Sequence, residues 1–398
     1  MTEKLLADFL NKQTFDIRKT ENGRWIDQKC APDEVSFVAE CVLSLLRESG
    51  GNQFRSPEVW KSDHAVTKVQ TFFGKPDPLD KTTLDEYNKF FRQPLKMLSA
   101  AGVMKERRDG RGILFELLEP DVLEYLARTD WNSYQFLCLY IEKTLKDSGL
   151  WDPFATFLER QTDESYSEMK RKFEVFCLRH TPIDTEIEAR RIFAKVLNPL
   201  ACREHKRGTV AGHCSNTVIT FDMLRYNRVN WRDAGKSKNV SRQNQCKRNA
   251  LPSETYFTMK AKDEVKQFNK EFNGEKSEVL YPHSSGVATQ MHHIFPQHEF
   301  PALSSLVENI IPLTPSQHLG VAHPRGNTSL IDPDFQLSCL LTRNETIKRN
   351  VLDHYGPTGF YSFGNFMRVL DVGFGIDYFT HIEENDFDAV HEGIASRA

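Results

Sequence analysis

The sequence lacks long hydrophobic runs. Its apolar stretches, such as FVAECVLSLL at 37–46, fall well short of the ~20 apolar residues that a membrane-spanning helix requires. The first residues, MTEKLLADFLNKQ, mix charged and apolar side chains, and they lack the basic start, apolar middle and small-residue cleavage site of a secretory signal. We therefore expect a cytoplasmic protein with no membrane partner.

Paired cysteines and an excess of one charge are also absent. The eight cysteines are spread over 398 residues without a CxxC pair, which excludes the dense disulfide framework of small secreted domains. The formal net charge is only −3. A polyanionic partner would therefore have to bind at a local basic patch.

The N-terminal part has an order of elements typical of a winged helix-turn-helix. Helical spacing of apolar residues predicts helices over 33–49, 54–74 and 82–102. Asp33 is expected to cap the first helix, and a Thr83 to Glu86 capping box is expected to open the third.

Two strand-like runs, VMKERR and ILFELLE, follow the third helix around an Asp109–Gly110 turn and predict a β-hairpin. In a winged helix the third helix enters the major groove of DNA, and the hairpin contacts phosphate or the neighbouring groove. We expect Arg107, Arg108 and Arg111 to make those contacts here. Such domains also serve as protein-docking modules, which is the alternative.

A basic segment lies in the middle of the chain. Residues 225–249 contain eight Lys or Arg and one acid, Asp233, with Tyr226 and Trp231 interleaved. This pattern favours a surface that neutralises phosphates, although a solvated linker could have the same composition. The expected DNA contacts are Arg225, Arg228, Arg232, Lys236, Lys238 and Arg242.

Five of the 13 histidines lie between Met291 and Pro324. The pattern predicts a strand over 286–295, a loop, a second strand over 309–313, and a helix that begins at Thr314 and Pro315. A tight ββα unit brings the end of its first strand against the first turns of its helix. Histidines there could hold a divalent cation, and a neighbouring imidazole with a pKa near ~6.5 could take a proton from water, as in a phosphodiesterase.

The segment resembles the HNH, or ββα-metal, nuclease family through His292, His293, Asn309 and His318, with the last two nine residues apart. The resemblance implies that His293 is the general base and that His292 and His318 bind Mg²⁺ or Mn²⁺. It also implies that Asn309 braces the loop. His323 is a possible further ligand, or a histidine bonded to backbone.

Structural zinc is not expected. Many HNH proteins carry CxxC pairs around the motif, but Thr314 and Gln317 stand at those positions here. A second zinc set, Cys202, His205, His213 and Cys214, has a spacing that suits no zinc finger. The acid-x-Lys triplet at 264–266 has no convincing upstream partner for a different nuclease site.

We expect an α+β, mainly helical chain with four parts: a winged helix at 1–128, a helical connection at 129–215, a basic segment at 216–275, and an HNH domain with a packing extension at 276–398. The combination resembles a type II restriction endonuclease that cleaves double-stranded DNA. Because one HNH site cuts one strand, double-strand cleavage implies a homodimer. A modification-dependent DNA endonuclease and a DNA-binding regulator with a non-catalytic HNH segment are the alternatives.

Overall fold

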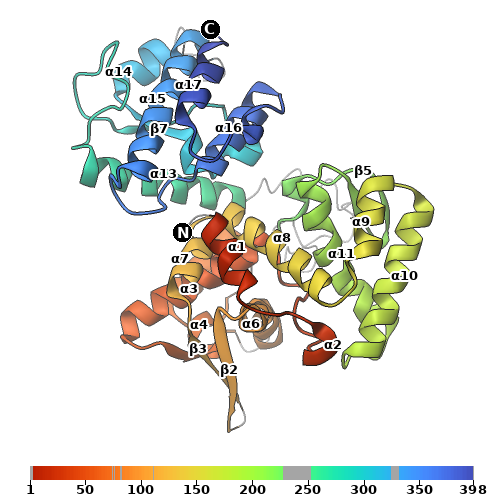
Figure 1. Ribbon diagram of the computed structural model, residues 1–398. Coiled ribbons are helices and arrows are strands. Elements are labelled where there is room, and N and C mark those ends of the chain that lie inside the picture. The colour runs from red at the N-terminus through yellow and green to blue at the C-terminus, as the bar shows by residue number, and fades with distance from the viewer. Residues whose placement is uncertain are drawn as a thin grey trace, which may run out of the picture. The chain divides into compact units, whose positions relative to one another are not determined.

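The computed structural model describes residues 3–73, 75, 77–80, 83–110, 112–226, 252–323 and 331–397. They form two compact units, Glu3–Ser253 and Glu254–Ala398 (Figure 1). The described chain is mainly helical with three small antiparallel sheets, which confirms the predicted α+β class. Within these residues, no helix has both the length and the apolar character needed to cross a membrane.

The first part of the N-terminal unit combines helices with a three-stranded sheet in the order β1-β3-β2. Its elements are α1 (Glu3–Asn11), α2 (Ile17–Thr20), α3 (Pro32–Ser49), β1 (Gln53–Arg55), α4 (Ser56–Trp60), α5 (Asp63–Phe73), α6 (Leu84–Ala100), β2 (Met104–Asp109), β3 (Gly112–Leu117) and α7 (Pro120–Arg128).

The first and third predicted helices are present as α3 and α6, whereas the second is divided into α4 and α5, and two of the expected caps are absent. Gly50 ends α3 in the left-handed conformation. Asp33 lies inside the first turn of α3 instead of capping it, and its carboxylate accepts a hydrogen bond from the Tyr226 amide at 2.8 Å. The Thr83 hydroxyl donates to the carbonyls of Asp77 and Asp80, so it does not form the expected capping box.

The β2–β3 hairpin turns where the sequence predicted, at Asp109 and Gly110, and Gly110 has a φ of +58°. The short strand β1, which lies inside the segment predicted as the second helix, pairs with β3. Phe54 and Phe115 stack with ring centroids 5.8 Å apart and anchor this sheet to the core.

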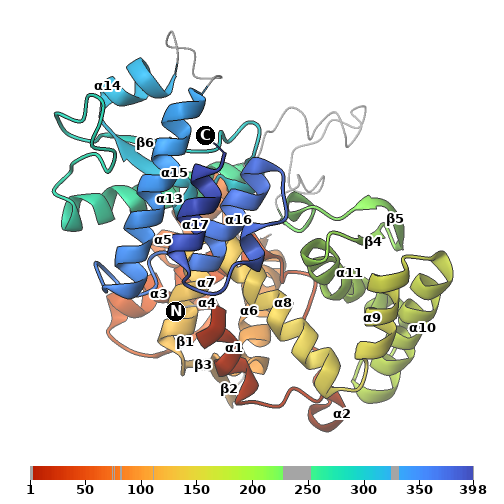
Figure 2. The same ribbon diagram turned by 45° about the horizontal axis from the view of Figure 1, so that its top comes forward.

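The rest of the N-terminal unit is a layer of long helices followed by a small hairpin, as Figure 2 shows. Its elements are α8 (Asp130–Asp147), α9 (Trp151–Arg160), α10 (Asp163–His180), α11 (Glu186–Arg203), β4 (Arg207–Val210), β5 (His213–Val218) and η2 (Phe221–Met223). The helices agree with the helical region expected from the sequence. Aromatic side chains such as Phe154, Phe173 and Phe193 fill the space between them.

The C-terminal unit surrounds the two-stranded β6–β7 sheet with helices. Its elements are α13 (Pro252–Phe272), β6 (Gln290–His293), η3 (Pro301–Leu303), η4 (Val307–Asn309), β7 (Ile310–Leu313), α14 (Pro315–Gln317), η5 (His318–Ala322), α15 (Pro333–Leu352), α16 (Phe363–Phe374), η7 (Phe379–His381) and α17 (Phe387–Ala395). The unit begins at Glu254, earlier than the boundary at 276 expected from the sequence. The reason is that α13 packs into it, with Phe268 stacked on Phe360 at 4.5 Å between centroids.

Candidate metal centre

The predicted strand–loop–strand–helix order is present around the histidines. β6 pairs with β7 in an antiparallel register that sets His292 opposite Ile311 and His293 opposite Ile310. Thr314 then caps the short helix α14, because its hydroxyl accepts a hydrogen bond from the Gln317 amide. Pro315 occupies the first turn, as expected from the sequence.

Helix α15 fixes the two strands against each other. The buried Arg343 guanidinium donates to the carbonyl of Ile310, at the start of β7, and pairs with Glu278 at 3.3 Å. Two turns earlier in the same helix, the side-chain amide of Gln336 donates to the carbonyl of Ile294 at 2.6 Å. Hydrogen bonds from α15 therefore hold the backbone that positions the histidines of β6.

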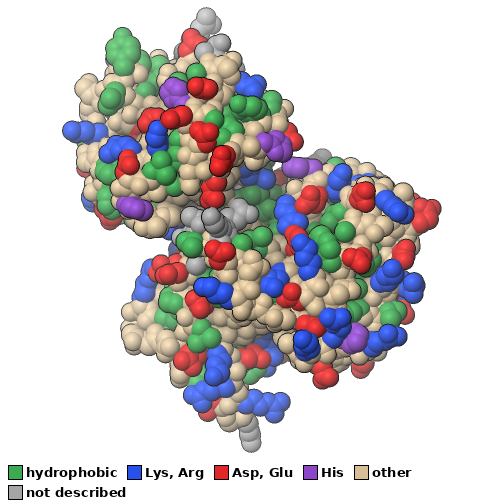
Figure 3. Space-filling view, in the orientation of Figure 1, with side chains coloured by type: hydrophobic (Ala, Val, Ile, Leu, Met, Phe, Trp, Pro, Cys, Tyr) green, Lys and Arg blue, Asp and Glu red, His purple; other side chains and the backbone are tan. Residues whose placement is uncertain are grey.

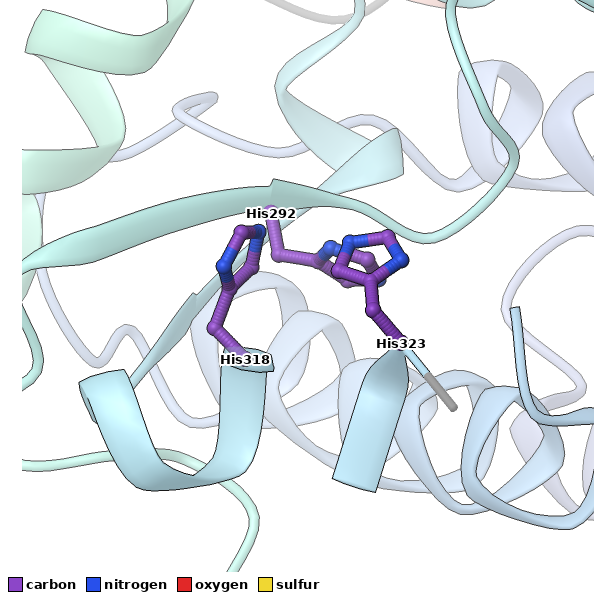
Figure 4. Close-up of side chains that lie close together, drawn as sticks. All are labelled: His292, His318 and His323. Atoms are coloured by element: carbon purple, nitrogen blue, oxygen red, sulfur yellow. The ribbon is translucent and has the colours of Figure 1, made fainter. Parts of the chain in front are cut away.

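His292, His318 and His323 point toward one another (Figure 4). Each offers one ring nitrogen to a common point, and these three nitrogens all lie within 4.8 Å of one another. The centroid of the His292 ring is 5.3 Å from that of His318 and 5.1 Å from that of His323. Among the described residues, this is the one group of histidines, cysteines or acids arranged to hold a metal ion.

A π-helix explains why His323 reaches the other two rings. Residues five apart lie about 140° apart around an α-helix, which would turn His323 away from His318. The chain from His318 to Ala322 is instead a π-helix, in which hydrogen bonds join residues i and i+5 and set them on one face. The centroids of His318 and His323 are 4.7 Å apart as a result.

The surroundings of His292 and His318 favour the neutral form of these two imidazoles. Burial, followed by the neighbouring rings of His318 and His323, holds the pKa of His292 well below its usual value. Burial also lowers the pKa of the half-buried His318. The Nδ1 atom of His318 is buried and has no hydrogen-bond partner, which is consistent with an atom that binds a ligand. The three residues therefore fit a metal ion.

His293 lies next to His292 but has a different partner. Its Nε2 atom is 3.0 Å from the carbonyl oxygen of Ser304. A carbonyl can only accept, so Nε2 carries the hydrogen and Nδ1 is left able to take a proton. Burial, together with the charge of Lys262, lowers the pKa of His293 to about 4, below the ordinary value assumed from the sequence.

Asn309 is fully buried and joins the two ends of the loop between the strands. Its side-chain oxygen accepts from the Phe295 amide at 2.9 Å, and its side-chain nitrogen donates to the carbonyls of Phe295 and Leu303. Leu303 directly precedes Ser304, the partner of His293. Asn309 thus links the loop through three hydrogen bonds, and the role that the resemblance implies for it stays a prediction.

A cavity of about 500 Å³ opens onto these groups. It is lined by Lys262, Met291, His292, His293, Pro296, Gln297, His298, Pro301, His318, His323 and Ile331. Lys262 was not among the predicted site residues, and it lies on α13, thirty residues before the motif. No local pattern distinguishes it from Lys260 or Lys266, so only the packing of α13 reveals it.

The residues predicted to contact DNA are only partly covered by the described chain. Arg107 and Arg108 are exposed on β2, and Lys and Arg side chains gather around this hairpin at the bottom of Figure 3. Arg111, Arg228, Arg232, Lys236, Lys238 and Arg242 lie outside the described residues.

The structure corrects the prediction that Arg225 contacts DNA. Its guanidinium is buried and pairs with Asp130 at 2.7 Å and with Asp222 at 2.8 Å. Asp130 is itself fully buried in the first turn of α8, and it requires a partner of opposite charge there. Arg225 therefore stabilises the N-terminal unit and is not available to DNA.

The two competing motifs are not assembled as metal or nuclease sites. Cys202 ends up buried in α11 and His213 and Cys214 lie on β5, and these residues do not form a metal-binding group within the described chain. Glu264 and Lys266 lie on the helix α13, whereas the acid-x-Lys site requires strand context.

Comparisons of the chain with protein-family models, with curated proteins and with solved structures found no match.

Proposed function

We propose that this protein is a metal-dependent endonuclease that hydrolyses phosphodiester bonds of double-stranded DNA by HNH-type chemistry. One observation carries the proposal. Three imidazoles converge within 4.8 Å beside a fourth, His293, whose Nε2 is bonded to a backbone carbonyl. Neutral metal ligands next to an oriented proton acceptor are the elements that hydrolysis of a phosphodiester requires.

His292, His318 and His323 would hold the cation. When bound, a divalent ion supplies positive charge that polarises the phosphoryl oxygen and stabilises the leaving oxygen. Imidazole nitrogen suits Zn²⁺ and Ni²⁺, whereas Mg²⁺ and Mn²⁺ favour oxygen ligands. We therefore expect Zn²⁺ or Ni²⁺ to bind more tightly than the Mg²⁺ or Mn²⁺ that the resemblance implied.

His293 would act as the general base. Its Nδ1 takes a proton from a water molecule, and the water oxygen forms a bond to phosphorus in line with the leaving group. The bond between phosphorus and the 3′ oxygen breaks, and the electron pair stays on that oxygen, which takes a proton from solvent. The products carry a 5′ phosphate and a 3′ hydroxyl.

The N-terminal unit would find the DNA as a winged helix. The support is the order α3, β1, α4, α5, α6, β2 and β3 with the sheet order β1-β3-β2, and the exposed Arg107 and Arg108 on the hairpin. Combined with a cutting unit, such a module suits a type II restriction endonuclease, with two copies acting on one duplex.

Cleavage of plasmid DNA tests the proposal. The purified protein is incubated with methylated and unmethylated supercoiled plasmid and with Zn²⁺, Ni²⁺, Mn²⁺, Mg²⁺ or EDTA, and the ends are sequenced. We expect cleavage that depends on metal, leaves 5′ phosphates and is lost in His318→Ala. Intact plasmid under every metal condition, or cleavage that persists in EDTA, would contradict the nuclease proposal.

A further inference from the structure

The cavity at the metal centre has an unusual charge. Among the described residues, the ionisable side chains that line it are those of Lys262 and five histidines, namely His292, His293, His298, His318 and His323. No Asp or Glu of the described chain lines it. A divalent cation on three neutral imidazoles would remain fully uncompensated. With the ammonium of Lys262, the cavity would carry about three positive charges and no acid to offset them.

Lys262 is half-buried on α13, a helix that precedes the ββα unit. Within the described residues no carboxylate pairs with it, and burial lowers its pKa. Its charge is close enough to His292, His293 and His318 to lower the pKa of each of them. An unpaired ammonium that is partly removed from water and lies beside a second cation-binding site raises the free energy of the protein, unless an anion binds between the two positive charges.

A phosphodiester supplies such an anion. It has two non-bridging oxygens, so one could face a bound cation while the other accepts a hydrogen bond from the ammonium of Lys262, which lines the same cavity. Building on the proposed function, we propose that Lys262 is a further catalytic residue whose Nζ donates a hydrogen bond to a non-bridging oxygen of the scissile phosphate. The role is electrostatic: as water adds to phosphorus, Lys262 keeps its proton and stabilises charge on the phosphoryl oxygens.

Three variants separate this role from simple packing. Lys262→Met keeps a long apolar side chain and removes the charge, and Lys262→Arg keeps the charge in a different shape. Lys270→Met removes an exposed lysine from the same helix as the matched control. Calorimetry measures the Zn²⁺ affinity of each metal-free protein. Each protein is then loaded with one equivalent of Zn²⁺, calorimetry measures its affinity for inorganic phosphate, and single-turnover assays measure cleavage of a DNA duplex.

We expect Lys262→Met to bind phosphate about tenfold more weakly and to cleave on the order of 10²-fold more slowly. Its affinity for Zn²⁺ should be unchanged or higher, because a neighbouring positive charge has been removed. Lys262→Arg should recover part of both losses, and Lys270→Met should match the unaltered protein.

Two results would overturn the role of Lys262: phosphate affinity equal to that of the unaltered protein, or loss of Zn²⁺ affinity together with activity, which would mark a structural residue. The phosphate measurement decides this even for a protein that cuts no DNA. Absence of cleavage by the unaltered protein would instead refute the proposed function, whatever the result for Lys262.

Discussion

His292 and His293 are neighbours in the sequence, but their side chains have different surroundings. His292 contacts the rings of His318 and His323, whereas His293 is bonded to the Ser304 carbonyl. The difference follows from the period of a β-strand, in which successive side chains point to opposite faces. Because β6 ends at His293, both residues still line one cavity. Binding a metal and accepting a proton can thus be separated over two adjacent residues.

Replacement of the proposed base tests this division. We expect His293→Ala to slow single-turnover DNA cleavage on the order of 10²-fold or more, because the variant lacks the imidazole that is proposed to take the proton from water. Metal affinity and DNA affinity, measured by calorimetry and by fluorescence anisotropy, should stay close to those of the unaltered protein.

The exposed His391 on α17 provides the matched control, and His391→Ala should cleave normally. Normal cleavage by His293→Ala would refute the role given to His293. Loss of metal binding in that variant would place it among the ligands instead.

Asn309 permits a prediction about stability. In Asn309→Ala, the amide of Phe295 and the carbonyls of Phe295 and Leu303 lose their side-chain partner in a buried loop. Since each buried polar group left unsatisfied costs about 1–3 kcal/mol, we expect the free energy of unfolding of the C-terminal unit to fall by about 3 kcal/mol or more. Urea denaturation followed by circular dichroism measures this change. An unchanged midpoint would mean that the loop does not depend on Asn309.

At the scale of elements, the site depends on one irregular helix. An α-helix would have separated His318 from His323, and the π-helix between them brings both to His292. The nine-residue spacing between Asn309 and His318 was readable as a motif, and the five-residue spacing to His323 left two interpretations open. Helix irregularity depends on how the whole segment packs, so local periodicity could not decide between them.

The β2–β3 hairpin gives a prediction at the same scale. If Arg107 and Arg108 contact phosphates, the double variant Arg107→Ala, Arg108→Ala should bind a DNA duplex about tenfold more weakly at low salt. The slope of log affinity against log salt should fall by about two, because each lost phosphate contact removes one released counterion.

Fluorescence anisotropy across a salt series measures both quantities. Arg171→Ala, Lys172→Ala removes the same charge from the exposed side of α10 and should leave the slope unchanged. Equal losses in the two double variants would mean that only net charge matters and that the hairpin has no specific contact.

At the scale of the whole molecule, the chain divides into two units with different content. The N-terminal unit contains the three-stranded sheet with the basic hairpin, and the C-terminal unit contains the complete histidine cluster with its cavity. All described residues that line the cavity belong to the C-terminal unit. The described part of one chain therefore offers one candidate centre, and under the proposed function each centre would hydrolyse one strand at a time.

This count predicts the assembly that acts on DNA. We expect two protein copies per duplex during double-strand cleavage, because each strand requires its own centre. Size-exclusion chromatography with light scattering, with and without a DNA duplex in EDTA, measures the stoichiometry. Cleavage that rises more steeply than linearly with protein concentration should accompany it. One copy per duplex, with nicked circles accumulating before linear DNA, would favour a monomer that cuts the strands in turn.

Local sequence signals were sufficient to predict several elements of the fold. Apolar periodicity marked the long helices, Asp109 and Gly110 marked the hairpin, and Thr314 with Pro315 marked a helix start. These features depend on backbone preferences and hydrogen bonds between residues close in the chain, so a short window contains the information.

Tertiary structure alone decided the features that join distant segments. Arg225 appeared to be one member of a basic run, yet the buried Asp130, 95 residues away, draws it into the core. Lys262 carries no local mark, and the packing of α13 brings it to the histidines. Burial and long-range pairing depend on which surfaces meet after folding, and these contacts determine whether a charged side chain serves stability or chemistry.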